Sequence, residues 1–277
     1  MIALELIREN EFVTLINIVL MVIIGIFTGV VTGLTGSSGV MVVVPLLNMV
    51  LDYPIHDAIG TSLMVDIIAP FAIAFSYYRH GNIDLRSGIW IAIGSIGGAQ
   101  LGATFSAGLP ENGLGGIFGL YLTIMGLLIW RKGINRRAIV DKFQNIIKFS
   151  TKYQKLFTSL TLGFLIGIVT GLLGAGGGGM ILIVLVFVLD FPLHVAIGTS
   201  VMIMAITATS GTIGYALNGF IRPLTGLIVG ASAVGGGTIS AFCANRVKEK
   251  TLANAIGIIF MVLGIVMTVI RFIKMQG

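Results

Sequence analysis

The sequence predicts an all-helical membrane protein that crosses the bilayer several times, and two observations support this. Hydrophobic residues make up 56% of the 277 residues and charged residues only 10%, with a mean hydropathy of +1.04. A soluble domain carries about 25% charged residues, so this chain lacks the polar side chains that a water-facing surface needs. Several apolar runs also reach about 20 residues, the length that a helix needs to span a bilayer.

The chain contains two copies of one unit. Residues 25–62 and 163–200 align without a gap, 138 positions apart, and half of the aligned positions are identical. Internal repeats of this kind are typical of secondary transporters. We therefore divide the chain into a first transmembrane repeat (1–131), a basic cytoplasmic linker (132–156) and a second transmembrane repeat (157–277).

Each repeat is predicted to hold about four spans and one short segment. The apolar segments lie at 12–34, 39–51, 56–78, 87–108 and 111–130, and then at 157–173, 178–189, 194–217, 223–244 and 251–271. The second segment of each set has about 12 residues, or roughly 18 Å of helix, which cannot cross a hydrocarbon core of about 30 Å. It is predicted to be a half-helix or re-entrant segment.

The basic residues predict the orientation of the two repeats. Eight of the 17 Lys and Arg lie between Arg131 and Lys155, and loops 79–86 and 245–250 are also basic. Short basic loops stay on the cytoplasmic side, so the two repeats are expected to be inverted relative to each other in the plasma membrane. This topology accounts for the net charge of +6 without nucleic acid as a partner. The linker is read either as an amphipathic helix on anionic lipid or as unstructured chain.

The stretch GLLGAGGGG at 171–179 matches the dinucleotide pattern G-x-G-x-x-G, yet its flanks are membrane spans and its counterpart GLTGSSGVM lacks the pattern. Two interpretations remain open. The glycines pack two helices closely, or the chain unwinds here so that the N–H groups of the short helix bind an anion. Four consecutive glycines exceed what packing requires, which favours the second. The predicted substrate-binding residues are Gly36, Ser37, Ser38, Gly39, Gly174, Gly176, Gly177 and Gly178.

The tetrapeptide Ile-Gly-Thr-Ser occurs at the same place in both repeats. Its hydroxyls, on Thr61, Ser62, Thr199 and Ser200, either bond back to helix carbonyls or line the same anion site. The duplication favours the lining role, so all four are included among the predicted substrate-binding residues.

Asp66 lies in the middle of the span 56–78, where its counterpart in the second repeat is Met204. A carboxyl group at the bilayer centre costs about 2.5–3.5 kcal/mol on insertion scales and usually faces a cavity. Asp66 is therefore the candidate coupling residue, with a proton as the candidate coupling ion. The alternative is a protonated carboxyl that simply bonds a neighbour.

The duplicated motifs resemble the TauE/SafE family of sulfite exporter-like transporters. The resemblance rests on the glycine runs, the Ala-Ile-Gly-Thr-Ser motifs and one Gly-Asn-Ile-Asp element. These residues are Gly25, Gly29, Gly33, Gly36, Gly39, Pro45, Ala58 to Ser62 and Gly81 to Asp84, then Gly163, Gly167, Gly171, Gly174, Gly176 to Gly179 and Ala196 to Ser200.

The resemblance implies a permease for sulfite, sulfoacetate or other small sulfur-containing or organic anions, with neither enzymatic activity nor a cofactor. Three departures from the family pattern keep the substrate open: Ser37-Ser38 replace glycines, Ile183 replaces the proline matched by Pro45, and Arg222 replaces the aspartate matched by Asp84. We expect alternating access around an anion site at the two half-helix starts.

Three competing functions remain. The first is a permease for another small solute or a cation that Asp66 coordinates. The second is an intramembrane enzyme, whose candidate bases His56, His80 and His194 all lie near span ends. The third is a sensor, which the lack of a soluble domain disfavours. The lone Cys243 excludes a disulfide within the chain, and no metal site is expected.

Overall fold

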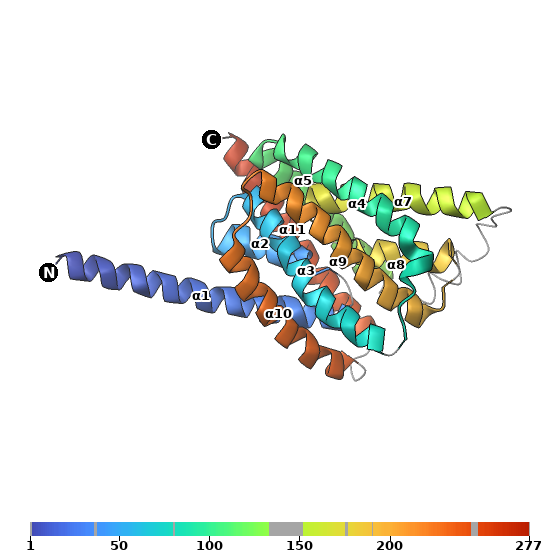
Figure 1. Cartoon of the computed structure of the whole chain (residues 1–277). Coiled ribbons are helices and arrows are strands. Elements are labelled where there is room, and N and C mark those ends of the chain that lie inside the picture. The colour runs from blue at the N-terminus through green and yellow to red at the C-terminus, as the bar shows by residue number, and fades with distance from the viewer. Residues whose placement is uncertain are drawn as a thin grey trace.

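The computed structural model describes residues 2–35, 38–79, 81–132, 152–174, 177–189, 191–244 and 249–276, which form helices and short connections (Figure 1). The first repeat contains α1 (Ile2–Thr35), α2 (Val40–Val50), α3 (Ile55–Arg79), α4 (Leu85–Ala107) and α5 (Glu111–Lys132). The second contains α7 (Lys152–Leu173), α8 (Gly178–Phe187), α9 (Leu193–Leu217), α10 (Pro223–Ala244) and α11 (Glu249–Gln276). The all-helical prediction is confirmed.

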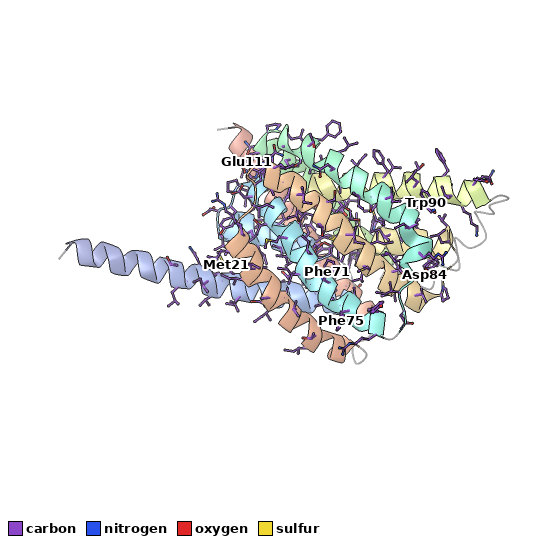
Figure 2. The ribbon with its side chains drawn as sticks, viewed as in Figure 1. Met21, Phe71, Phe75, Asp84, Trp90 and Glu111 are labelled. Atoms are coloured by element: carbon purple, nitrogen blue, oxygen red, sulfur yellow. The ribbon has the colours of Figure 1, made fainter. Side chains whose placement is uncertain are left out.

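The outer surface of the helices is apolar. Eight helices among the described residues are long and apolar enough to cross a membrane. Phe105 is 65% exposed and Leu217 is 77% exposed, and Figure 2 shows such side chains extending outward from the bundle. Large apolar side chains are costly to expose to water, whereas lipid tails accommodate them. The protein is therefore a multi-pass membrane protein, as the composition predicts.

The two short helices occur where the sequence predicts them. α2 has 11 residues and α8 has 10, so each rises roughly 16 Å and cannot cross the bilayer alone. α2 is enclosed by its neighbours: Val40, Val42, Val43 and Leu47 are completely buried. A helix buried in this way can begin in the interior of the protein, provided that its first N–H groups find partners there.

The two repeats exchange their first helices. α1 packs against α10 of the second repeat, and α7 packs against α4 of the first. Glycines allow the close approach: a side-chain carbon at Gly29 would lie 2.1 Å from the carbonyl oxygen of Ala233, and one at Gly171 would lie 2.1 Å from that of Ala99. These glycines in the long helices therefore serve close packing between helices, as small residues do in membrane proteins.

The first helices of the two repeats run in opposite directions. In Figure 1, α1 runs from the N-terminus at the left toward the right, whereas α7 begins at the right and runs toward the left. α3 and α9 oppose each other in the same way. This arrangement agrees with the predicted inversion of the repeats.

The helix ends differ slightly from the predicted boundaries. α7 begins at Lys152, inside the segment 132–156 that we expect to be a linker, and α5 ends at Lys132. Residues 133–151 lie outside the described part of the chain, so both interpretations of the linker stay open. The exact boundaries between the two repeats and the linker therefore remain predictions.

Candidate functional site

The start of α2 is held by a carboxyl group from α3. The Ser38 hydroxyl donates a hydrogen bond to Asp66 Oδ2, and the Gly39 N–H donates one to Asp66 Oδ1 over 3.2 Å. The N–H of Val40 in turn donates to the Ser38 hydroxyl over 3.2 Å. Asp66 thus caps α2 from another helix, and it occupies the place where an anion at a helix start would be bound.

Asp66 is buried without a cationic partner. Its side chain is 2% exposed, and within the described residues no basic side chain forms an ion pair with it. The polar groups that compensate its burial are therefore the Ser38 hydroxyl, the Gly39 N–H and the positive end of the α2 dipole. Asp66 therefore bonds to neighbouring groups in this geometry, and its coupling role stays a prediction.

Two threonines of α1 stand next to the same helix start. A side-chain carbon at Gly39 would lie 2.5 Å from Thr28 Cγ2, 3.2 Å from Thr32 Oγ1 and 3.6 Å from Asp66 Oδ1. Both threonines are buried, and neither hydroxyl has a hydrogen-bond partner among the described residues. These two residues are not among those predicted from the sequence, although the repeat offers a signal for one of them, because Thr28 aligns with the apolar Ile166.

The start of α8 aligns with the start of α2 in the other repeat, but different side chains surround it. Its N-cap residue is Gly177. A side-chain carbon at Gly177 would lie 2.3 Å from Ile166 Cγ2, and one at Gly178 would lie 2.6 Å from the sulfur of Met204. The Thr170 hydroxyl donates to the carbonyl of Ile166 over 2.9 Å. This half-site is therefore less polar than its counterpart.

Gly174 connects the second repeat to the first. It adopts φ +65, a left-handed conformation that glycine tolerates best. A side-chain carbon there would lie 2.8 Å from Ile59 Cγ2, 3.3 Å from Val40 Cγ1 and 3.4 Å from Ser62 Oγ. The structure thus brings Gly174 together with Ser62 and with the start of α2. The predicted site residues Gly36, Ser37 and Gly176 lie outside the described residues.

The Ile-Gly-Thr-Ser motifs join the two repeats. The N–H of Arg222 donates to Thr61 Oγ1, and the N–H of Asp84 donates to Thr199 Oγ1, both over 3.0 Å. Each threonine therefore caps a helix of the other repeat, since α10 begins at Pro223 and α4 at Leu85.

The neighbouring residues of the motif also have structural contacts. A side-chain carbon at Gly60 would lie 2.2 Å from the carbonyl oxygen of Phe220. The Ser62 and Ser200 hydroxyls bond back to the carbonyls of Ile59 and Ile197, at 2.7 and 2.9 Å. These contacts match the back-bonding interpretation of the serines, and substrate contact by the four hydroxyls stays a prediction.

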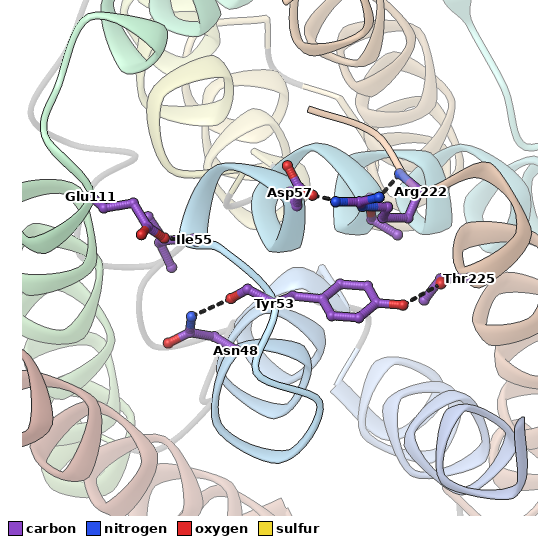
Figure 3. Close-up of polar contacts among 8 residues, drawn as sticks. Asn48, Tyr53, Ile55, Asp57, Glu111, Arg222 and Thr225 are labelled. Carbon is purple, nitrogen blue, oxygen red and sulfur yellow. Dashed lines mark hydrogen bonds and ion pairs between the residues drawn. The ribbon is translucent and has the colours of Figure 1, made fainter. Parts of the chain in front are cut away.

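A second polar group of residues joins the repeats near the start of α3 (Figure 3). Asp57 Oδ2 pairs with Arg222 Nε at 2.7 Å, and the hydroxyls of Tyr53 and Thr225 are 2.8 Å apart. From the sequence, Arg222 stands out only as a departure from the family pattern. The signal is again repeat asymmetry: Val195 and Phe191 replace Asp57 and Tyr53, so this pairing cannot form in the second repeat.

The histidines have structural surroundings where they are described. His56 stacks on Phe220 with ring centroids 4.8 Å apart, and its Nε2 lies 3.0 Å from the carbonyl oxygen of Ser106. His80 and the side chain of His194 are outside the described part. Among the described residues no cluster of His, Cys, Asp and Glu could hold a metal ion.

The chain is similar to known membrane proteins along nearly its whole length. It matches the family Sulfite exporter TauE/SafE over residues 21–267. It is 27% identical to the probable membrane transporter protein YunE of Bacillus subtilis over 263 residues, covering 90% of this chain and 96% of the relative. It is 28% identical to the probable membrane transporter protein YdhB of the same organism, over 86% of this chain and 94% of the relative. No solved structure matches the chain significantly.

The family match and the eight apolar helices support the same conclusion. The resemblance identified from the duplicated glycine and Ile-Gly-Thr-Ser motifs is confirmed. The chain belongs to the sulfite exporter TauE/SafE family and is a multi-pass membrane transporter.

Proposed function

We propose that the protein is a secondary transporter of small sulfur-containing or organic anions, such as sulfite, sulfoacetate or other sulfonates, in the plasma membrane. One observation carries this proposal. The start of α2 already binds the two carboxyl oxygens of Asp66, through a hydroxyl and a backbone N–H. A sulfonate presents similar oxygens, so the same donors suit it.

The absence of lysine and arginine from the centres of the described spans fits a transporter rather than a tight binder. A full positive charge in a buried site would hold an anion strongly, whereas a helix start offers about half a charge. The bound anion can therefore leave on the other side of the membrane. Alternating access around the two half-helix starts is the mechanism that we propose, with transport rather than catalysis as the activity.

Asp66 is the residue through which we propose that transport is coupled to protons. A substrate anion and the Asp66 carboxylate compete for the same donors, so protonation of Asp66 would favour substrate binding. Asp66→Asn should then remove the effect of a pH gradient on transport. The measurement is uptake and efflux of labelled sulfite and sulfoacetate in proteoliposomes, with and without the gradient. Gradient-independent transport by the wild type that Asp66→Asn leaves unchanged would exclude proton coupling.

The runner-up is a permease for a cation that Asp66 coordinates. The Asp66 carboxyl group favours it, but the Gly39 N–H, which donates to Asp66, disfavours a positive charge there. The same vesicles tested with a panel of monovalent and divalent cations distinguish the two functions. Cation transport that needs Asp66, without any anion transport, would replace the proposed function by this one.

A further inference from the structure

The start of α2 is a more complete anion site than Asp66 alone requires. We propose that Thr32 supplies a hydroxyl ligand to a transported anion that takes the place of the Asp66 carboxyl group at Ser38 and Gly39. The ligand class is a small monovalent oxyanion, a carboxylate or a sulfonate. This inference rests on the proposed function and assigns the binding to the first repeat.

The space beside Gly39 is shared by the carboxylate and by Thr32. A side-chain carbon at Gly39 would lie 3.2 Å from Thr32 Oγ1 and 3.6 Å from Asp66 Oδ1. The absence of a side chain at Gly39 therefore lets both oxygens approach the same point of the backbone. The methyl group of Thr28 packs against that point as well, 2.5 Å from the position of a side-chain carbon.

The Thr32 hydroxyl is available for a ligand. Thr28 is 1% exposed and Thr32 is 6% exposed, and neither has a hydrogen-bond partner in the part of the chain that the structure describes. Buried hydroxyls are almost always paired, so an unpaired one in a polar site calls for a partner. Many threonines of these spans instead bond to the carbonyl four residues earlier, as Thr170 and Thr207 do.

The chemistry of the site selects an anion. Gly39 contributes an N–H, the α2 dipole is positive at its start, and the hydroxyls of Ser38 and Thr32 can all donate. A cation would meet the N–H group and the positive end of the helix. The internal occupant is a carboxylate bound through two oxygens, which indicates that a ligand with two or three equivalent oxygens would fit.

The second repeat lacks this set of groups and provides the control. Ile166 replaces Thr28, Met204 replaces Asp66, and the hydroxyl of Thr170, the counterpart of Thr32, bonds to its own helix. If the two half-sites bound anions equally, the hydroxyls of Thr32 and Thr170 would matter equally. Under the proposal, loss of the Thr32 hydroxyl weakens anion binding, whereas loss of the Thr170 hydroxyl does not.

The test measures equilibrium binding of labelled methanesulfonate and of labelled acetate to the purified full-length protein in nanodiscs. Thr32→Val removes the hydroxyl at nearly constant shape and should weaken binding at least about tenfold, as expected for one lost hydrogen bond to a charged group. Thr32→Ser restores the hydroxyl and should recover most of the affinity. Thr170→Val should leave affinity within about threefold, because its hydroxyl is satisfied by its own helix.

Asp66→Asn completes the test because it removes the competing charge and keeps the shape. It should tighten anion binding at least about tenfold. Comparing the two probes shows whether the site prefers a carboxylate or a sulfonate.

The outcomes separate this inference from the proposed function. Equal effects of Thr32→Val and Thr170→Val, or no binding of either probe, would overturn the inference, even if the wild type transports anions in vesicles. Selective loss with Thr32→Val, rescued by Thr32→Ser, would support it even if the vesicles show no transport. In that second case only the proposed function fails.

Discussion

The starts of α2 and α8 are the same feature built twice with different side chains. Both are short helices that begin at a glycine-rich break, and both follow a long helix that packs on the other repeat. At α2 the lining is polar, with Asp66, Ser38 and two threonines. At α8 the lining is Ile166 and Met204, with Thr170 bonded to its own helix.

The comparison shows what the duplication preserves. The glycines and the helix start are common to both repeats, since α2 begins at Val40 and α8 begins at the aligned Gly178. The side chains around the two helix starts are not the same. Under the proposed function, this asymmetry would let the first half-site bind the charged part of a ligand and the second adapt to its uncharged part, since methionine is flexible and polarizable.

The largest expected effect comes from making the two starts alike. Met204→Asp places a second carboxyl group near α8, where the methionine sulfur would be 2.6 Å from a side-chain carbon at Gly178. A charge in mid-span costs about 2.5–3.5 kcal/mol and would repel the substrate, so transport should be lost. The measurement is substrate uptake into vesicles, normalised to the amount of folded protein. Met204→Leu is the control and should transport at nearly the wild-type rate. Wild-type uptake by Met204→Asp would show that the two starts are interchangeable.

Filling the break should have the next largest effect. A side-chain carbon at Gly177 would lie 2.3 Å from Ile166, so Gly177→Leu should abolish transport by closing the backbone at the start of α8. Gly179→Ala is the matched control, because nothing lies within 4 Å of a side-chain carbon there. Near-normal transport by Gly177→Leu would leave these glycines with a packing role only.

Removing the Ser38 hydroxyl tests the polar start of α2. Ser38→Ala deprives Asp66 of its hydroxyl donor, and leaving a buried acceptor underpaired costs about 1–3 kcal/mol. The melting temperature in detergent should therefore fall. Ser62→Ala, which removes only a bond to the carbonyl of its own helix, should lower it less. If both variants melted alike, the Ser38–Asp66 bond would contribute little.

The Asp57–Arg222 ion pair should have the smallest effect on stability. The Arg222 side chain is 59% exposed, and exposed pairs contribute about 0–1 kcal/mol. A double-mutant cycle of Asp57→Asn and Arg222→Gln should therefore give a coupling energy below about 1 kcal/mol in unfolding experiments. A larger coupling energy would show that this ion pair contributes substantially to the contact between α3 and the second repeat.

Much of the fold could be predicted because membrane-spanning helices are recognisable from the hydropathy of the sequence. Runs of apolar residues bounded by polar loops mark helices to within a few residues, as 56–78 does for α3 (Ile55–Arg79). Breaks at glycine and proline mark the short helices. In a bilayer every backbone group must be paired internally, so few alternatives to these helices exist.

The site was harder to predict because its contacts cross between helices. The repeat alignment places Asp66 opposite Met204, but nothing in it says that Asp66 reaches the start of α2. In the same way, spacing along the chain cannot show that Thr61 caps a helix that begins at Pro223. Such pairs depend on how helices rotate and cross, which close packing decides.

The sequence by itself determined the class of this protein: its helices, its duplicated breaks and its family follow from hydropathy and repeated motifs, which act locally. The tertiary structure decided which break is polar and what fills it. A buried carboxyl group needs donors, and only the packing of α1, α2 and α3 brings Ser38, Gly39 and Thr32 close to Asp66. The local sequence pattern determines where a helix can start, and the residues packed around that start determine what it can bind.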